Sequence, residues 1–79
     1  MDSSEVGGHV RKRRRDLGIT QAELSALAGC SSAFLRNLEQ GKASVRLDKL
    51  SDVLEVLGLT LEIVEAPKPE VIDAASEDS

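Results

Sequence analysis

Four residues near the middle of the chain combine two short side chains with two long ones that form directional hydrogen bonds. Ser32 and Ala33 are short, and Arg36 and Asn37 follow one helical turn later. A guanidinium can donate two hydrogen bonds to guanine, and a carboxamide can make a two-point contact with adenine. If these residues share the outward face of one helix, that face is suited to contact with base edges in a DNA groove. The alternative is an ordinary helical corner with no ligand.

The elements that must position this face are two short helices joined by a tight turn. The sequence TQAE predicts a capping box, in which the Thr20 hydroxyl and the Glu23 carboxylate each accept a backbone amide of the other residue. We expect this helix to begin at Thr20 and to end before Gly29. Ser31 is expected to cap the next helix, which stops at Gly41 because glycine readily adopts the left-handed conformation at a helix end.

Two longer helices are expected to flank this pair. Residues 4–17 place Val6, Val10 and Leu17 on one stripe at helical spacing, and residues 46–57 form a second amphipathic segment. The first of these segments contains the run RKRRR, whose five side chains cover all sides of a helix and therefore cannot share one role. We interpret most of them as residues that face DNA phosphates or solvent.

The period of the sequence changes after the fourth predicted helix. Residues 59–65 have a period of two, which is typical of a β-strand. Leu59, Leu61 and Ile63 would lie on one side of this strand, with Thr60, Glu62 and Val64 on the other. One strand cannot remain unpaired in water, and an exposed edge invites another chain. We therefore expect this strand to pair with its copy in a second subunit, with Leu59, Leu61 and Ile63 at the dimer interface. The predicted fold class is mainly α, with four helices and one C-terminal β-strand that pairs across a homodimer.

The net charge of −4 at pH 7 hides opposite charges in the two halves of the 79-residue chain. Residues 1–46 hold eight Lys and Arg against five Asp and Glu, whereas residues 47–79 hold two against nine. A basic first half is suited to nucleic acid, and an acidic second half indicates a different partner surface. From residue 67 onward, prolines, small residues and acids predict a disordered acidic tail.

Several classes of site are not expected. Cys30 and His9 are the only residues of their types, so the sequence supports neither a disulfide within the chain nor a cysteine-rich metal site. We interpret His9 as a solvated surface residue and Cys30 as part of the core, with an oxidation-sensitive thiol as the alternative for Cys30. No catalytic constellation or cofactor motif is found, so we expect no enzyme. With no apolar span of membrane or signal type, the chain is expected to be cytoplasmic.

The segment VRKRRRDLGITQAELSALAGCSSAFLRNLEQGK resembles the helix-turn-helix domain of XRE/Cro-type bacterial and phage regulators. The resemblance spans about residues 6–57, and Arg14, LGITQAEL, AGCS and LEQGK stand at the spacings of that family. The ending LEVLGLTLEIVEA is similar to HipB-type regulators, in which a C-terminal strand replaces a fifth helix. Cys30 is the one departure, because the family commonly has a β-branched residue there. The resemblance implies a compact four-helix bundle that is usually dimeric.

The resemblance also implies roles for individual residues. The residues that would contact the bases of double-stranded DNA are Ser32, Ala33, Arg36 and Asn37. The residues that would contact phosphates are Gln21, Ser31, Lys42, Ser44 and Arg46. Gln21 would also orient its neighbours. Arg14 would form a partly buried bidentate bridge with Glu39, which would lock the first helix to the third.

These observations predict a domain organisation and a function. Residues 1–58 would form the helix-turn-helix domain, residues 59–66 the dimerisation strand and residues 67–79 the tail. The expected function is a homodimeric repressor of its own promoter region, which binds a palindromic operator with half-sites roughly 34 Å apart or a multiple of that. One alternative is a HipB-like antitoxin that also neutralises a kinase toxin through residues 47–79. Another is a stand-alone controller of a mobile element or a restriction system.

Overall fold

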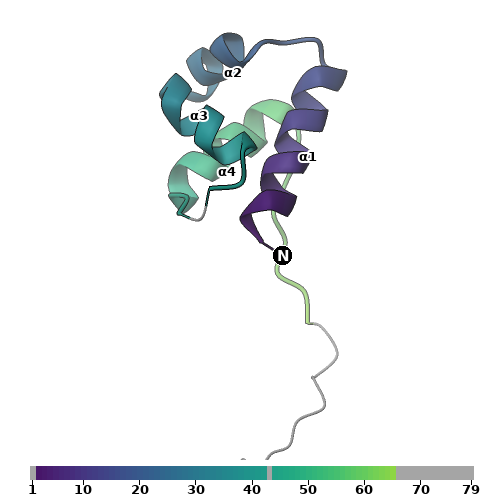
Figure 1. The fold of residues 1–79 in the computed structure, drawn as a ribbon. Coiled ribbons are helices and arrows are strands. Elements are labelled where there is room, and N and C mark those ends of the chain that lie inside the picture. The colour runs from purple at the N-terminus through teal and green to yellow at the C-terminus, as the bar shows by residue number, and fades with distance from the viewer. Residues whose placement is uncertain (1, 43, 66–79) are drawn as a thin grey trace, which may run out of the picture.

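The structure is a computed structural model that describes residues 2–42 and 44–65. Within these residues the chain forms four helices (Figure 1). They are α1 (Ser3–Asp16), α2 (Gln21–Ala28), α3 (Ser32–Glu39) and α4 (Leu47–Leu57). Each end lies within one residue of the boundary expected from the sequence, so the prediction of a mainly helical chain with four helices is confirmed. None of these helices is both long and apolar enough to cross a lipid bilayer.

Side-chain caps explain why the two central helices begin where they do. The Thr20 hydroxyl accepts the Glu23 amide at 3.0 Å, and the Glu23 carboxylate accepts the Thr20 amide at 2.8 Å. The Ser31 hydroxyl accepts the Phe34 amide at 3.0 Å. Gly29 follows α2 in the left-handed conformation, which residues with a side chain rarely adopt. The predicted capping box and the predicted Ser31 cap are therefore both present.

An aliphatic core holds the four helices together. α1 packs against α3, and α2 packs against α4. The largest fully buried side chains are Val10, Leu24, Leu35, Leu38, Val53 and Leu57. Each buried aliphatic side chain stabilises the fold by about 1.5–3 kcal/mol relative to an exposed one. These few side chains therefore supply much of the stability of so small a bundle.

Close packing of α1 on α3 depends on a glycine. Gly7 is buried, and a Cβ atom added there would overlap the carbonyl oxygen of Leu38. The neighbouring Gly8 is exposed, and a Cβ atom there would have no neighbour within 4 Å. Gly7 therefore lets the backbone of α1 approach the carboxyl end of α3, a requirement that the helical pattern of the sequence does not reveal.

Residues 59–65 leave α4 after Gly58 and extend toward the end of the bundle at which the N-terminus lies (Figure 1). They form neither helix nor strand within the single chain. A strand needs a neighbour for its backbone groups, and the described part of one chain supplies none. The strand expected over residues 59–66 therefore stays a prediction, and the tail expected over residues 67–79 lies outside the described residues.

Candidate nucleic-acid interface

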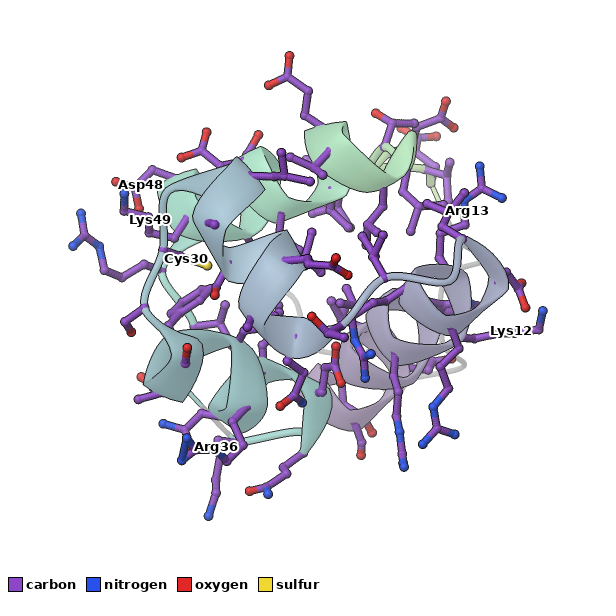
Figure 2. All side chains as sticks on the ribbon, turned by 90° about the horizontal axis from the view of Figure 1, so that it is seen from above. Lys12, Arg13, Cys30, Arg36, Asp48 and Lys49 are labelled. Atoms are coloured by element: carbon purple, nitrogen blue, oxygen red, sulfur yellow. The ribbon has the colours of Figure 1, made fainter. Side chains whose placement is uncertain are left out.

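One face of α3 is open to solvent over its whole length. Ser32, Ala33, Arg36 and Asn37 are all exposed, and they share this face because they stand at helical spacing. The opposite face of the helix is buried in the core. Arg36 projects away from the bundle (Figure 2). The structure therefore brings together the four residues that were expected to contact bases.

The amino end of α3 is arranged in a way that favours an anion. The Ser31 oxygen accepts the Phe34 amide, so the Ser31 hydroxyl proton can still be donated to another group. The backbone amides of the first helical turn lack partners within the helix and carry partial positive charge. A phosphate beside this end would meet both the hydroxyl group and the positive end of the helix.

An ion pair fixes α3 to α1. The Arg14 guanidinium donates from Nε to Glu39 Oε2 at 2.7 Å and from Nη2 to Glu39 Oε1 at 2.9 Å. The two side chains are 11% and 3% exposed, so the pair is shielded from water. Arg14 also donates from Nη1 to the carbonyl oxygen of Ile19 at 3.0 Å. The bidentate bridge that the resemblance implies is therefore present, and it joins α1, the turn before α2, and α3.

The surroundings of Glu39 keep its carboxylate charged. Burial alone would raise the pKa of Glu39, but hydrogen bonds from Arg14 and Gln21, together with the charges of Arg14 and Arg11, lower this pKa below its ordinary value. The hydrogen bond to Glu39 in turn raises the pKa of Arg14. Both groups therefore stay ionised around neutral pH, as a charged bridge requires.

Gln21 connects this bridge to the start of α2. Its Nε2 donates to Glu39 Oε1 at 3.0 Å, so one carboxylate oxygen accepts from both Gln21 and Arg14. Gln21 is also the first residue of α2, where a backbone amide has no carbonyl partner within the helix. The bridge therefore orients the Gln21 side chain, while the backbone amide remains suited to a phosphate.

The loop between α3 and α4 presents three further polar residues to solvent. Lys42, Ser44 and Arg46 are exposed, and Arg46 pairs with Asp48 at 2.8 Å. The hydrogen bond from Arg46 lowers the pKa of the Asp48 carboxyl group. The two side chains are 71% and 63% exposed, and surface pairs of this kind contribute little free energy. A phosphate can therefore compete with Asp48 for the Arg46 guanidinium.

The basic run of α1 has divided roles, as its spacing predicts. Lys12 pairs with Asp16 on its own helix at 2.8 Å, whereas Arg13 donates to the carboxyl end of α4 at 2.9 Å. Figure 2 shows Lys12 extended into solvent and Arg13 beside the end of α4. Arg11 and Arg15 are exposed and line a polar recess of about 290 Å³ between α1, α2 and α3.

Two hydrogen bonds from basic residues to backbone carbonyls were not expected from the sequence: that of Arg13 and one from Lys49. Lys49 Nζ donates to the carbonyl oxygen of Gly29 at 3.1 Å, which ties α4 to the turn between α2 and α3. Neither contact leaves a signal in the helical pattern, because each joins residues that meet only after the helices have packed. From the sequence, Arg13 and Lys49 can be identified only as charged residues, without their partners.

The single cysteine and the single histidine lie in different surroundings. Cys30 is partly buried against the core, and this burial raises the pKa of its thiol. His9 is exposed on α1. Within residues 2–42 and 44–65, no group of three or more His, Cys, Asp or Glu side chains is placed to hold a metal ion.

The chain is similar to known proteins in both sequence and structure. A family model described as Helix-turn-helix matches residues 10–64. The uncharacterized HTH-type transcriptional regulator y4mF of Sinorhizobium fredii is 33% identical over 61 residues, which cover 77% of this chain and 80% of that protein. A second uncharacterized HTH-type transcriptional regulator of the same organism, y4dJ, is 33% identical over 55 residues, which cover 70% of this chain and 71% of that protein.

Solved structures of HipB share the fold of this chain. A HipB variant in an O2 20mer complex has a TM-score of 0.76 at 24% identity, with 85% of this chain and 93% of that chain covered. HipB in an O4 20mer complex has a TM-score of 0.76 at 22% identity, with 85% and 94% covered. Because the family model matches more than half of the sequence, the chain belongs to the helix-turn-helix family and is a DNA-binding transcriptional regulator of the XRE type.

Proposed function

We propose that the chain is a homodimeric, sequence-specific repressor that binds a palindromic operator in its own promoter region. The observation that carries this proposal is the exposed face of α3, which is held in place by the shielded bridge between Arg14 and Glu39. A recognition helix must present its side chains in one fixed direction. A bidentate charged pair supplies that direction, because its planar groups align in one way.

Each residue of this face has chemistry suited to part of a base pair. Arg36 can donate two hydrogen bonds to guanine, and Asn37 can make two contacts with adenine. Ser32 and Ala33 keep the helix end close to the base edges because their side chains are short. A good two-point contact contributes about 1–3 kcal/mol of discrimination against the wrong base, so Arg36 and Asn37 would carry most of the specificity.

Residues that would contact phosphates lie at both ends of the exposed face of α3. The proposed residues lie at the start of α2, at the cap of α3 and in the loop before α4: Gln21, Ser31, Lys42, Ser44 and Arg46. Contacts of this kind position a protein on the duplex without reading its sequence. The two charged residues among them would make the affinity fall as the salt concentration rises.

An exposed apolar surface supports the proposed second subunit. Leu47, Leu61 and Ile63 are 68%, 44% and 101% exposed, and they line a groove of about 600 Å³ between α4 and residues 59–63. Clustered exposed apolar side chains mark interaction surfaces. We call residues 59–65 the dimer segment. Its antiparallel pairing with a second copy would cover this surface and satisfy its backbone groups.

The likeness in fold to HipB supports the proposed operator binding, because those HipB structures are complexes with 20mers.

The dimer segment is joined to the helical bundle through Leu59, which packs against the core of its own chain. Two bundles joined in this way would place one α3 in each of two major grooves. The expected half-sites are then roughly 34 Å apart or a multiple of that distance.

A footprint over the DNA upstream of the chain's own gene tests the proposal. We expect protection of two inverted half-sites whose centres are separated by whole turns of the duplex. Sedimentation of the free protein should give the mass of a dimer. Protection of one site without symmetry, or of no upstream site, would contradict the proposed operator.

A second candidate function is that of a HipB-type antitoxin, which would also neutralise a kinase toxin. The observation that favours it is the acidic surface of the second half, where the exposed acids are Asp48, Asp52, Glu55, Glu62 and Glu65. A kinase encoded beside the gene should then co-purify with the chain. Charge reversal at Asp52, an exposed acid of α4 outside the dimer segment, should release that kinase and leave DNA binding unchanged. Failure of the two proteins to associate would exclude this function.

A further inference from the structure

We infer that Arg13 is a positioning residue for DNA binding by the proposed dimer, because it sets the direction in which the dimer segment leaves the bundle. The inference rests on the proposed homodimer and adds to it a residue that contacts neither DNA nor the second subunit. Its basis is the hydrogen bond from Arg13 Nε to the carbonyl oxygen of Leu57 at 2.9 Å. Leu57 is the last residue of α4, and the dimer segment begins two residues later.

This hydrogen bond meets a specific need at the end of α4. The last carbonyl oxygens of a helix lack partners within it, and a positive charge beside them is favourable. Gly58 adopts the left-handed conformation, and the Leu59 amide turns back to the Leu54 carbonyl oxygen at 2.8 Å. This closure leaves the Leu57 carbonyl oxygen free to accept, and the Arg13 guanidinium donates to it. The guanidinium thus holds the turn against α1.

Arg14, which follows Arg13 on α1, holds the proposed recognition helix α3. Arg14 bonds Glu39 at the carboxyl end of α3, while Arg13 bonds the carboxyl end of α4. Because α1 is one continuous helix, these two anchors relate the orientation of α3 to the starting direction of the dimer segment. In a dimer with a two-fold axis, a small change in that direction moves the two α3 helices relative to each other. A palindromic operator requires one fixed separation between them.

Two simpler roles for Arg13 can be distinguished from this one. Contact with DNA alongside α3 does not fit its place, because Figure 2 shows Arg13 and Arg36 on opposite sides of the bundle. A purely stabilising role would change the melting temperature of a variant and leave the geometry of the dimer unchanged. The separation of the two α3 helices is therefore the quantity to measure.

Distances between spin labels in the free dimer provide this measurement without a known operator. One label per subunit is attached to a cysteine at the exposed Gln40, beside α3, in a full-length chain that also carries Cys30→Ala. Pulsed electron spin resonance then reports the separation of the two α3 helices. The test variant is Arg13→Met, which removes the donor. Lys12→Met is the matched control, because Lys12 pairs with Asp16, which lies on α1 itself.

We expect a narrow distance distribution for the labelled parent and for Lys12→Met, and a broader or shifted one for Arg13→Met at a similar melting temperature. Arg13→Lys keeps a positive charge near the helix end and should restore most of the narrow distribution. The same narrow distribution for Arg13→Met and Lys12→Met would overturn the inference and leave the dimer intact. Absence of coupling between labels in the parent would instead overturn the proposed homodimer, and the inference with it.

Discussion

Arg14 and Glu39 meet through two hydrogen bonds of 2.7 and 2.9 Å, at a place where both side chains are shielded from water. The pair joins the first helix to the end of the helix that carries the exposed face. A planar guanidinium and a planar carboxylate fix direction as well as distance. In addition to core packing, the orientation of α3 is therefore fixed by a contact between residues that are 25 positions apart in the sequence.

Removal of the carboxylate should destabilise the fold strongly. In Glu39→Ala the Arg14 guanidinium stays largely shielded without its partner, and such a loss costs roughly 3–5 kcal/mol. Thermal or urea unfolding of the full chain measures the change. Lys12→Ala is the control, since its exposed pair with Asp16 contributes less than about 1 kcal/mol. Equal, small losses in both variants would show that the bridge does not hold the fold.

The same carboxylate should make the free energy of unfolding depend on pH in acid. Folding lowers the pKa of Glu39, so the unfolded chain binds this proton more readily than the folded chain does. The stabilising contribution is fully present above about pH 4.3, the ordinary value for Glu, and is lost as the pH falls through the folded-state pKa. Urea unfolding at a series of acidic pH values should show this loss, and Glu39→Gln should reduce it. If Glu39→Gln kept the pH dependence of the parent, the loss of stability in acid would not come from the Glu39 carboxylate.

Two neighbouring glycines should respond in opposite ways to alanine. Gly7→Ala places a Cβ atom against the Leu38 carbonyl oxygen, and forcing α1 away from α3 should cost about 1–3 kcal/mol. Gly8→Ala adds a Cβ atom in open space and should stabilise the helix by about 0.5–1 kcal/mol. Urea unfolding midpoints compare the two proteins. If both variants were equally stable, the backbones of α1 and α3 would not be in close contact at Gly7.

Formation of the dimer should depend on the dimer segment. Leu61→Pro removes a backbone donor and an apolar side chain from the proposed strand, and should give a monomer that binds DNA weakly. Deletion of residues 67–79 should leave both properties unchanged, because it begins beyond that strand. Sedimentation measures the association state of each protein. A stable Leu61→Pro dimer at micromolar concentration would mean that the subunits meet elsewhere.

The helices could be predicted from the sequence because their ends are set by near neighbours. The bonds between Thr20 and Glu23, and from Phe34 to Ser31, each join residues three positions apart. The pattern of types at that spacing is therefore enough to place a helix start. The bridge from Arg14 is different, since its partner is distant and only the resemblance to a family implied it.

Contacts that depend on how the helices pack could not be predicted. Arg13 meets Leu57 across 44 positions, and Lys49 meets Gly29 across 20. In the sequence both basic residues look like ordinary charges on a helix surface. The fit of Gly7 against α3 likewise depends on the distance between two backbones. The strand stays a prediction for another reason, because its proposed partner belongs to a second chain.

The affinity of Arg36→Ala for its operator tests most directly whether α3 reads DNA. Mobility-shift titrations would compare the parent, Arg36→Ala and Arg46→Ala on the footprinted operator and on operators with each base pair changed in turn. We predict that Arg36→Ala loses about 1–3 kcal/mol at the operator and loses its preference at one base pair of each half-site. Arg46→Ala should weaken binding to all these sequences alike, because it would contact a phosphate. Unchanged operator affinity and unchanged base preference in Arg36→Ala would contradict the assignment of the exposed face of α3 as the surface that reads DNA.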